Sequence, residues 1–150
     1  MRQQLAQDKT EYQELVLIEN ERFGRVLMLD GVAQTTSADE FIYHEMLSHV
    51  PLLAHGQAAD VLIVGGGDCG LAEEVLKHPT VRSVTQVEID AQVVEFSRRH
   101  LAELNAPVFA DERFHLQIAD GAVFMAESQQ QFDVVLIDST DPTGAAQVLF

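Results

Sequence analysis

The chain of 150 residues is poor in basic residues, with nine lysines and arginines against 24 acidic residues. The formal net charge is −15 at pH 7. Binding to nucleic acid requires basic patches that neutralise phosphates, so this balance argues against a nucleic-acid partner. An acidic cleft would instead attract a polycationic ligand, although an acidic balance is also ordinary for soluble proteins.

Cysteine and long apolar runs are also scarce. The single cysteine, Cys69, excludes an internal disulfide framework and is typical of a reducing compartment. No run of 18 apolar residues is present, and the polar start at residues 1–4 lacks the apolar core of a signal peptide. We therefore expect a cytoplasmic protein that has no membrane partner. An apolar content of 47% is enough for one domain-sized core with a small appendage.

A glycine turn follows the strongest strand signal of the chain. Residues 61–64 form an unbroken apolar run, which is typical of a strand buried on both faces of a parallel sheet. Gly65, Gly67 and Gly70 fit G-x-G-x-x-G ahead of a helical pattern, but this match alone is weak evidence for a dinucleotide site. Asp68 argues against such a site, because a carboxylate in the loop would repel a pyrophosphate. The loop instead suits a cationic ligand such as an adenosyl sulfonium compound.

The amino-terminal part reads as a small β-structure. Residues 12–36 alternate short apolar runs with turn signals, and Asp30-Gly31 between two such runs is a strong hairpin signal. We expect a three-stranded antiparallel meander within an amino-terminal segment at residues 1–36.

A helix and a linker are expected over residues 37–58. Ser37 and Glu40 match a capping box that opens the helix, and Pro51 kinks or ends it. His44 lies off the apolar arc of this helix, so the ordinary interpretation is a surface histidine. One face of the helix carries Ile42, Met46, His49, Val50 and Leu53.

Strand and helix signals alternate from residue 59 to the end of the chain. This alternation predicts right-handed crossovers and an α/β fold with a doubly wound parallel sheet, whose ligands bind beyond the carboxyl ends of the strands. The expected strands are 61–64, 83–89, 114–118 and 132–137, and the expected helices after the first are 91–104 and 121–127.

Carboxylates close or follow every one of these predicted strands. Chance accounts for one or two of them, since aspartate is common in loops, but acids after all four predict a shared binding edge. They are Asp68, Glu88 with Asp90, Asp120, and Asp138 with Asp141.

Each group of acids has a chemical interpretation and an ordinary one. Glu88 stands where the acid of a nucleotide site accepts both ribose hydroxyls, or it is a surface charge. Asp120-Gly121 suits an adenine ring, or caps the next helix. Asp138 and Asp141 together could hold an ammonium, and one could take a proton from it; the alternative is a turn with an aspartate cap.

Seven segments in this order resemble the polyamine aminopropyltransferase family, most closely its bacterial spermidine synthases. The resemblance runs through nearly all 150 residues and is far more specific than the glycine loop alone. The segments are Tyr12-Gln13-Glu14, 31–36, 39–46, 65–68, 87–90, 120–121 and 138–144.

This resemblance implies a Rossmann-like domain of the S-adenosylmethionine-dependent methyltransferase type over residues 59–150. It implies transfer of the aminopropyl group of decarboxylated S-adenosylmethionine to putrescine, which gives spermidine and methylthioadenosine. The donor is a co-substrate, so no cofactor is expected. The resemblance also implies a homodimer or a homotetramer.

The resemblance also implies a role for each matching residue. Asp138 would be the proton acceptor. His44, Asp68, Asp141, Tyr43 and Gln34 would contact the aminopropyl or polyamine side. Gln13, Glu88, Asp120, Gly121, Gly65 and Gly67 would hold the nucleoside.

No metal is expected, because His44 and His49 are five positions apart, about 140° around a helix, and do not share one face. Two positions depart from the family pattern. Cys69 stands where a further glycine is common, and would add strain of about 1 kcal/mol if φ is positive there. Ala145 replaces a proline that helps to shape the nucleoside pocket.

The chain stops at Phe150, just after the fourth predicted strand, whereas the family continues through further strands and helices. We expect a domain that is incomplete at its carboxyl end, with little activity as 150 residues alone. Two other functions remain open at this point. One is a small-molecule methyltransferase that uses S-adenosylmethionine, and the other is a nucleoside-binding remnant without turnover.

Overall fold

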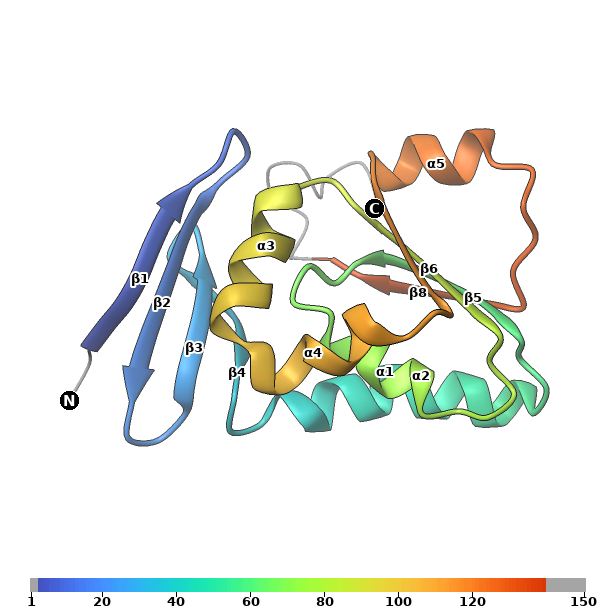
Figure 1. The fold of residues 1–150 in the computed structure, drawn as a ribbon, viewed down its shortest axis with the longest axis horizontal. Coiled ribbons are helices and arrows are strands. Elements are labelled where there is room, and N and C mark those ends of the chain that lie inside the picture. Colours follow the sequence, from blue (N-terminus) through green and yellow to red (C-terminus); the bar gives the residue numbers. More distant parts are fainter. Residues whose placement is uncertain (1–2, 140–150) are drawn as a thin grey trace. The chain divides into compact units, whose positions relative to one another are not determined.

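The computed structural model describes residues 3–139, drawn in colour in Figure 1. Two compact units divide between Tyr43 and His44. The division expected at residues 36 and 58 stays a prediction, because helix α1 (Glu40–His55) runs through the boundary between the units.

In the amino-terminal unit, the described residues form a four-stranded antiparallel sheet in the order β1-β2-β3-β4. The three antiparallel strands expected within residues 12–36 are present as β2, β3 and β4, but the expectation missed β1. This strand is polar and almost wholly exposed at the edge of the sheet, so it lacks the apolar alternation of a half-buried strand. The strands are β1 (Gln3–Lys9), β2 (Glu14–Asn20), β3 (Gly24–Leu29) and β4 (Val32–Thr36).

The hairpin expected at Asp30-Gly31 joins β3 to β4, with Leu29 opposite Val32. Asp30 has φ 48° and Gly31 has φ 80°. Positive φ at both central residues is what a type I′ turn requires, and this turn matches the twist of the two strands that it joins.

Helix α1 begins later than the capping box predicted, and of the two alternatives at Pro51, a kink or an end, the end is wrong. It begins at Glu40, and the Ser37 hydroxyl accepts a hydrogen bond from the Arg25 N–H at 3.0 Å. Ser37 therefore ties the strand end to β3. Pro51 does not end the helix, which continues to His55.

The buried face of α1 is also different from the apolar arc in the sequence. His44, Ser48 and Leu52 are the buried residues. The Ser48 hydroxyl donates to the His44 carbonyl at 2.7 Å, so its polar group is satisfied within the helix. Four members of the apolar face predicted from the sequence are instead more than half exposed, namely Ile42, Met46, Val50 and Leu53.

In the second unit, the described residues form a four-stranded parallel sheet in the order β7-β6-β5-β8. The doubly wound α/β fold predicted from the alternating pattern is confirmed. The strands are β5 (Asp60–Gly65), β6 (Ser83–Glu88), β7 (Phe114–Ile118) and β8 (Val134–Asp138). The helices are α2 (Gly70–Leu76), α3 (Ala91–His100), α4 (Ala102–Ala110) and α5 (Gly121–Glu127).

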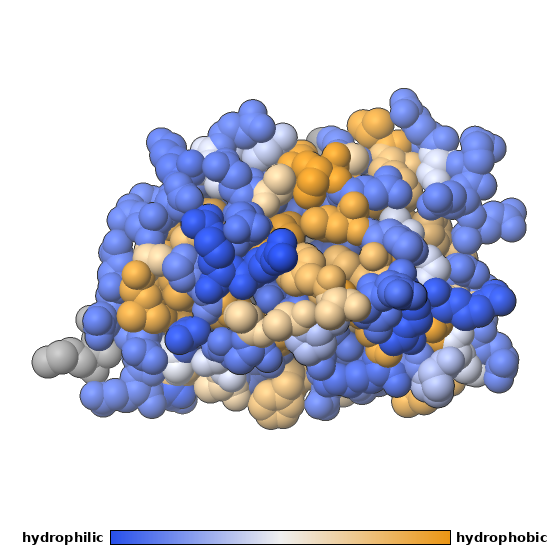
Figure 2. Space-filling model, viewed as in Figure 1, coloured by the Kyte–Doolittle hydropathy of each residue, from blue (hydrophilic) through white to orange (hydrophobic). Residues whose placement is uncertain are grey.

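Both faces of the parallel sheet are covered by helices, with α5 on the opposite side from α2 and α4 (Figure 1). Val61, Ile63 and Val84 pack with buried residues of α1 to α4, whereas Leu62, Val64 and Val87 pack against Phe124 of α5. Val123 and Met125 of α5 are 50% and 40% exposed, and hydrophobic surface is visible over α5 at the upper right of Figure 2. Parallel strands covered on both faces read as continuous apolar runs, as residues 61–64 do.

The helix expected over residues 91–104 is two helices. The chain leaves the helical conformation at Leu101 (φ −124°), whose side chain is buried, and α4 continues to Ala110 despite Pro107. Within residues 3–139, no helix combines the length and the apolar character needed to span a bilayer.

Candidate active site

The glycine loop between β5 and α2 is tied to the end of β8. Gly65 and Gly66 have φ 86° and 70°, values that glycine adopts without strain. The Gly66 N–H donates to the main-chain oxygen of Asp138 at 2.8 Å. The loop thereby places Asp68, which follows it, at the same edge of the sheet as Asp138.

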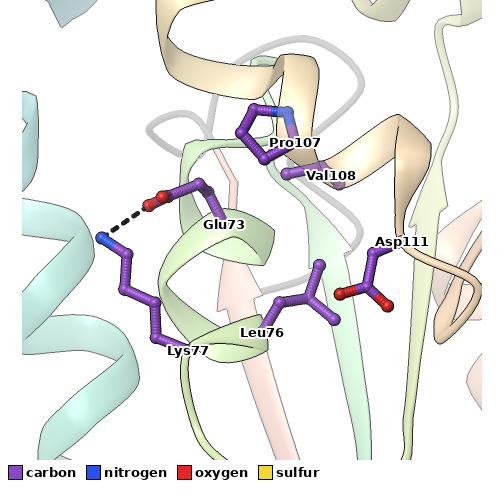
Figure 3. A pocket seen from close by; sticks show the side chains of 6 residues that line it. All are labelled: Glu73, Leu76, Lys77, Pro107, Val108 and Asp111. Carbon is purple, nitrogen blue, oxygen red and sulfur yellow. Dashed lines mark ion pairs between the residues drawn. The ribbon is translucent and has the colours of Figure 1, made fainter.

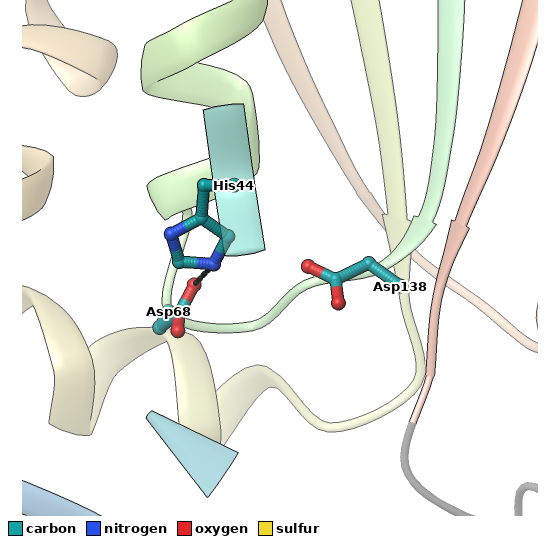
Figure 4. Close-up of side chains that lie close together, drawn as sticks. All are labelled: His44, Asp68 and Asp138. Atoms are coloured by element: carbon teal, nitrogen blue, oxygen red, sulfur yellow. Dashed lines mark ion pairs between the residues drawn. The ribbon is translucent and has the colours of Figure 1, made fainter. Parts of the chain in front are cut away.

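His44, Asp68 and Asp138 converge at this edge from three elements (Figure 4). The imidazole Nε2 of His44 lies 3.7 Å from Oδ1 of Asp68. One imidazole nitrogen and one oxygen from each carboxylate lie within 4.8 Å of one another. Their ligand atoms are thus close enough to share one cation, whether an ammonium group or a metal ion, and the expected absence of a metal stays a prediction.

His44 is held in place by its packing against α2. It is only 2% exposed, and a Cβ atom at Gly70 would overlap the imidazole ring. The interpretation of His44 as a surface histidine is therefore wrong. Its partner on α2 is distant in the sequence, so helical periodicity could not reveal the burial.

Glu88 faces the glycine loop from the end of β6. It is 8% exposed, and a Cβ atom at Gly67 would lie 3.2 Å from its Oε2. Burial raises the pKa of Glu88 to about 7, even though the Asp90 N–H donates to Oε1 at 3.0 Å; the negative charges of Asp90 and Asp138 add to the rise. Glu88 is thus a buried acid that takes up or releases a proton near neutral pH.

Asp120 serves as the N-cap of α5. Its Oδ1 accepts from the N–H groups of Ala122 at 2.8 Å and Val123 at 3.2 Å. Gly121 is the first residue of the helix. The helix cap expected at Asp120 is therefore present, and contacts of Asp120 and Gly121 with an adenine ring stay a prediction.

The remaining predicted site residues belong to the amino-terminal unit or fall outside the described residues. Gln13, Gln34 and Tyr43 belong to the amino-terminal unit, and their roles stay predictions. Gln13 donates from its main chain to Thr10 Oγ1 at 3.0 Å, and Gln34 Nε2 donates to the Val32 carbonyl at 3.2 Å. Asp141 and Ala145 fall outside residues 3–139.

Cys69 occupies the strained position that its departure from the family pattern implied. It has φ 63° at the start of α2 and is fully buried. Burial raises the pKa of the Cys69 thiol, and the charge of Asp68 raises it further. The thiol is therefore neutral near pH 7 and acts as a small packing group rather than a nucleophile.

Two buried amide side chains that the sequence patterns did not single out also contact the loop. Gln86 of β6 donates from Nε2 to the carbonyls of Gly65 and Gly66, and Asn105 of α4 donates from Nδ2 to the carbonyl of Asp68. A signal for Gln86 was available, because it is a polar residue inside a predicted buried strand. No comparable signal marked Asn105.

A cavity of about 160 Å³ lies between α2 and α4, and its lining includes neither Asp68 nor Asp138 (Figure 3). Its polar groups already have partners: Lys77 Nζ lies 2.8 Å from Glu73 Oε2 and 2.6 Å from Glu74 Oε1. Asp111 is bound by Arg113, whose hydrogen bonds lower the pKa of that carboxyl to about 2. None of the predicted site residues lines this cavity.

Comparison with known families matches both parts of the chain. Residues 40–150 match the spermine/spermidine synthase domain, and residues 2–37 match the spermidine synthase tetramerisation domain. A polyamine aminopropyltransferase of Ruegeria sp. (strain TM1040) is 60% identical over 142 residues, which are 95% of this chain and 50% of that protein. One of Pseudomonas syringae pv. tomato (strain DC3000) is 55% identical over 150 residues, or 100% of this chain and 52% of that protein.

Two solved structures have the same fold. A spermidine synthase in complex with the transition state analogue AdoDATO has a TM-score of 0.94 and 42% identity, covering 98% of this chain and 50% of that one. The spermidine synthase of Thermotoga maritima has a TM-score of 0.87 and 40% identity, covering 91% and 47%. The chain thus spans about half the length of the relatives it matches. The domain matches over most of its residues establish that this chain belongs to the spermine/spermidine synthase family.

Proposed function

We propose that this protein transfers the aminopropyl group of decarboxylated S-adenosylmethionine to putrescine, giving spermidine and methylthioadenosine. The observation that carries the proposal is the grouping of His44, Asp68 and Asp138 beside the glycine loop. Two carboxylates so close together are stabilised by a cation between them, and both the amine and the sulfonium donor carry positive charge. The names of the relatives support the same reaction.

The chemistry assigned to Asp138 is proton acceptance. An alkyl amine has a pKa near 10 and is mostly protonated at neutral pH, so it needs a base before it can attack. Its nitrogen lone pair then forms a bond to the carbon beside sulfur. The carbon–sulfur bond breaks, its electron pair stays on sulfur as a neutral thioether, and the positive charge passes to nitrogen.

Asp68 and His44 are assigned to the charged amino end of the aminopropyl group. A fixed charge partner at that end would orient the reacting carbon against the amine, and orientation is a large source of acceleration in a displacement reaction. Glu88 is assigned to the ribose hydroxyls, and its position opposite Gly67 supports this assignment. Gly67 itself has no room for a side chain, because a Cβ atom there would lie 2.6 Å from Cγ1 of Val93.

The donor is a co-substrate in this proposal, and no separate cofactor takes part. We also propose a homo-oligomer, a dimer or a tetramer. The match of residues 2–37 to a tetramerisation domain supports it. Putrescine is the proposed acceptor among several amines of similar chemistry.

The test is release of methylthioadenosine from decarboxylated S-adenosylmethionine and putrescine, measured for the 150-residue chain and for the whole reading frame that encodes it. We expect little turnover from the 150-residue chain alone. Asp138→Asn should lower kcat by about 100-fold or more, as loss of a general base does, while nucleoside binding is kept. Asp133→Asn, just before the start of the same strand, is the matched control and should leave kcat unchanged. Full turnover of Asp138→Asn would remove the proposed base.

A further inference from the structure

We propose that Gln86 and Asn105 are positioning residues for the two carboxylates of the site. Gln86 fixes the position of Asp138, and Asn105 fixes the position of Asp68. The proposal rests on the proposed function for its kinetic consequences. Its structural content, that two buried amides hold the glycine loop at its two ends, stands on the hydrogen bonds alone.

Gln86 acts on the end of the loop that joins β8. It is fully buried in β6, and its Nε2 donates to the carbonyl of Gly65 at 3.0 Å and to that of Gly66 at 2.6 Å. Gly66 in turn donates its N–H to the Asp138 carbonyl at 2.8 Å. A chain of hydrogen bonds therefore runs from the interior of the sheet through the glycine turn to the backbone of the proposed base.

Asn105 acts on the other end of the loop. It is fully buried in α4, and its Nδ2 donates to the Asp68 carbonyl at 3.0 Å. The Asp68 carboxylate accepts from the Gly70 N–H at 2.9 Å and faces His44. Asn105 thus holds the main chain of Asp68, while the following turn holds its side chain.

Both amides leave an oxygen buried without a regular hydrogen-bond partner among residues 3–139, namely Oε1 of Gln86 and Oδ1 of Asn105. The Cys69 thiol lies against Gln86, but a thiol is only a weak donor. Burying an unpaired amide oxygen is destabilising, so an apolar side chain would suit these core positions better. We infer that the two residues serve through their NH₂ groups, which bind the loop carbonyls.

The two ends of the loop predict different kinetic effects. If Asp138 shifts, proton acceptance and the line of attack suffer, so kcat should fall. If Asp68 shifts, the charged end of the donor is held less well, so KM for the donor should rise. A residue with only a packing role would produce no such split.

The test compares Gln86→Met and Asn105→Leu with Ser97→Ala in the whole reading frame. Ser97 is equally buried and its Oγ also has no partner within the described part of the chain, so it controls for the loss of a buried polar group. Gln86→Met should lower kcat about 10-fold or more with little change in donor KM, because a small misplacement of a reacting group is costly. Asn105→Leu should raise donor KM about 10-fold or more with little change in kcat. Ser97→Ala should change neither.

Hydrogen exchange of main-chain amides supplies a readout that does not need turnover. Gln86→Met should speed exchange at Gly66, and Asn105→Leu should speed exchange at Gly70. If wild type shows no turnover but the exchange pattern appears, the proposed function fails and the loop contacts stand. Unchanged exchange in both variants, or equal kinetic losses in all three, would overturn the positioning roles. If the apolar variants do not fold, Gln86→Asn, which withdraws the NH₂ group by one methylene, and Asn105→Ala, which removes it, provide the same test with neutral side chains no larger than those of wild type.

Discussion

Gly65 packs directly against Asp138: a Cβ atom at position 65 would overlap the main-chain oxygen of Asp138. The same oxygen accepts the Gly66 N–H. The end of β8 and the start of the glycine loop therefore fit together only while position 65 has no side chain.

This contact makes Gly65→Ala a test of the loop. Alanine meets two penalties there, a positive φ worth about 1–3 kcal/mol and an overlap with backbone that cannot move freely, worth a similar amount. We expect the free energy of unfolding in urea to fall by about 2–6 kcal/mol.

Gly56→Ala is the matched control for that variant. Gly56 has φ 79°, close to that of Gly65, and a Cβ atom there would meet nothing within 4 Å. Gly56→Ala should therefore lower the free energy of unfolding only by the penalty for a positive φ. Equal costs for the two variants would contradict the account of the Gly65 contact.

The raised pKa of Glu88 predicts that this residue makes stability fall as pH rises. The folded state holds the proton up to about pH 7, whereas an unfolded glutamate releases it near its ordinary pKa of 4.5. Folding therefore takes up a proton at pH values between these two pKa values. The free energy of unfolding falls by on the order of 3 kcal/mol as pH rises from the lower to the higher. Glu88→Gln should remove this loss, as measured by urea denaturation near pH 5 and near pH 8. An unchanged pH dependence would contradict the burial account.

The same proton should control nucleoside binding. The ionised carboxylate can accept two ribose hydroxyls, whereas the protonated acid has lost acceptor capacity. Calorimetry with methylthioadenosine should show affinity rising as pH increases through about 7 for wild type. The dependence should be absent in Glu88→Gln and kept in Glu95→Gln, an exposed control on α3.

Cys69 should be inert to thiol reagents in the folded protein. Burial raises its pKa and excludes the reagent, so labelling by iodoacetamide near pH 8 must wait for local opening. We expect the native rate to be about 100-fold or more below the rate in urea. Gln130→Cys, which adds an exposed thiol, should label rapidly under native conditions; rapid native labelling of Cys69 itself would show that the loop opens.

Asp68 should discriminate between donors that differ in one carboxylate. S-adenosylmethionine carries a negative group where the decarboxylated compound has none, and that group would meet Asp68. We expect wild type to bind the decarboxylated donor more tightly than S-adenosylmethionine. Asp68→Asn should reduce the ratio of the two affinities about 10-fold, a typical value for a close like-charge contact. Preference for S-adenosylmethionine in wild type would favour the methyltransferase alternative.

The alternation of strands and helices was readable in the sequence because it follows local rules. Buried parallel strands are continuous apolar runs, and the acids that follow them must lie at one edge once the strands are parallel. Glu88 and Asp138 were placed at that edge by this reasoning. Strand β1 was missed because an exposed edge strand carries no apolar alternation.

The sequence by itself determined the sheet, the glycine turn and the edge that collects the acids, since each depends on neighbours along the chain and on the direction of parallel strands. Only the tertiary structure decided that His44 is buried against Gly70, and that Gln86 and Asn105 hold the loop carbonyls. These contacts join elements far apart in the chain. They depend on which side chains meet when the helices pack on the sheet, and no local periodicity encodes that.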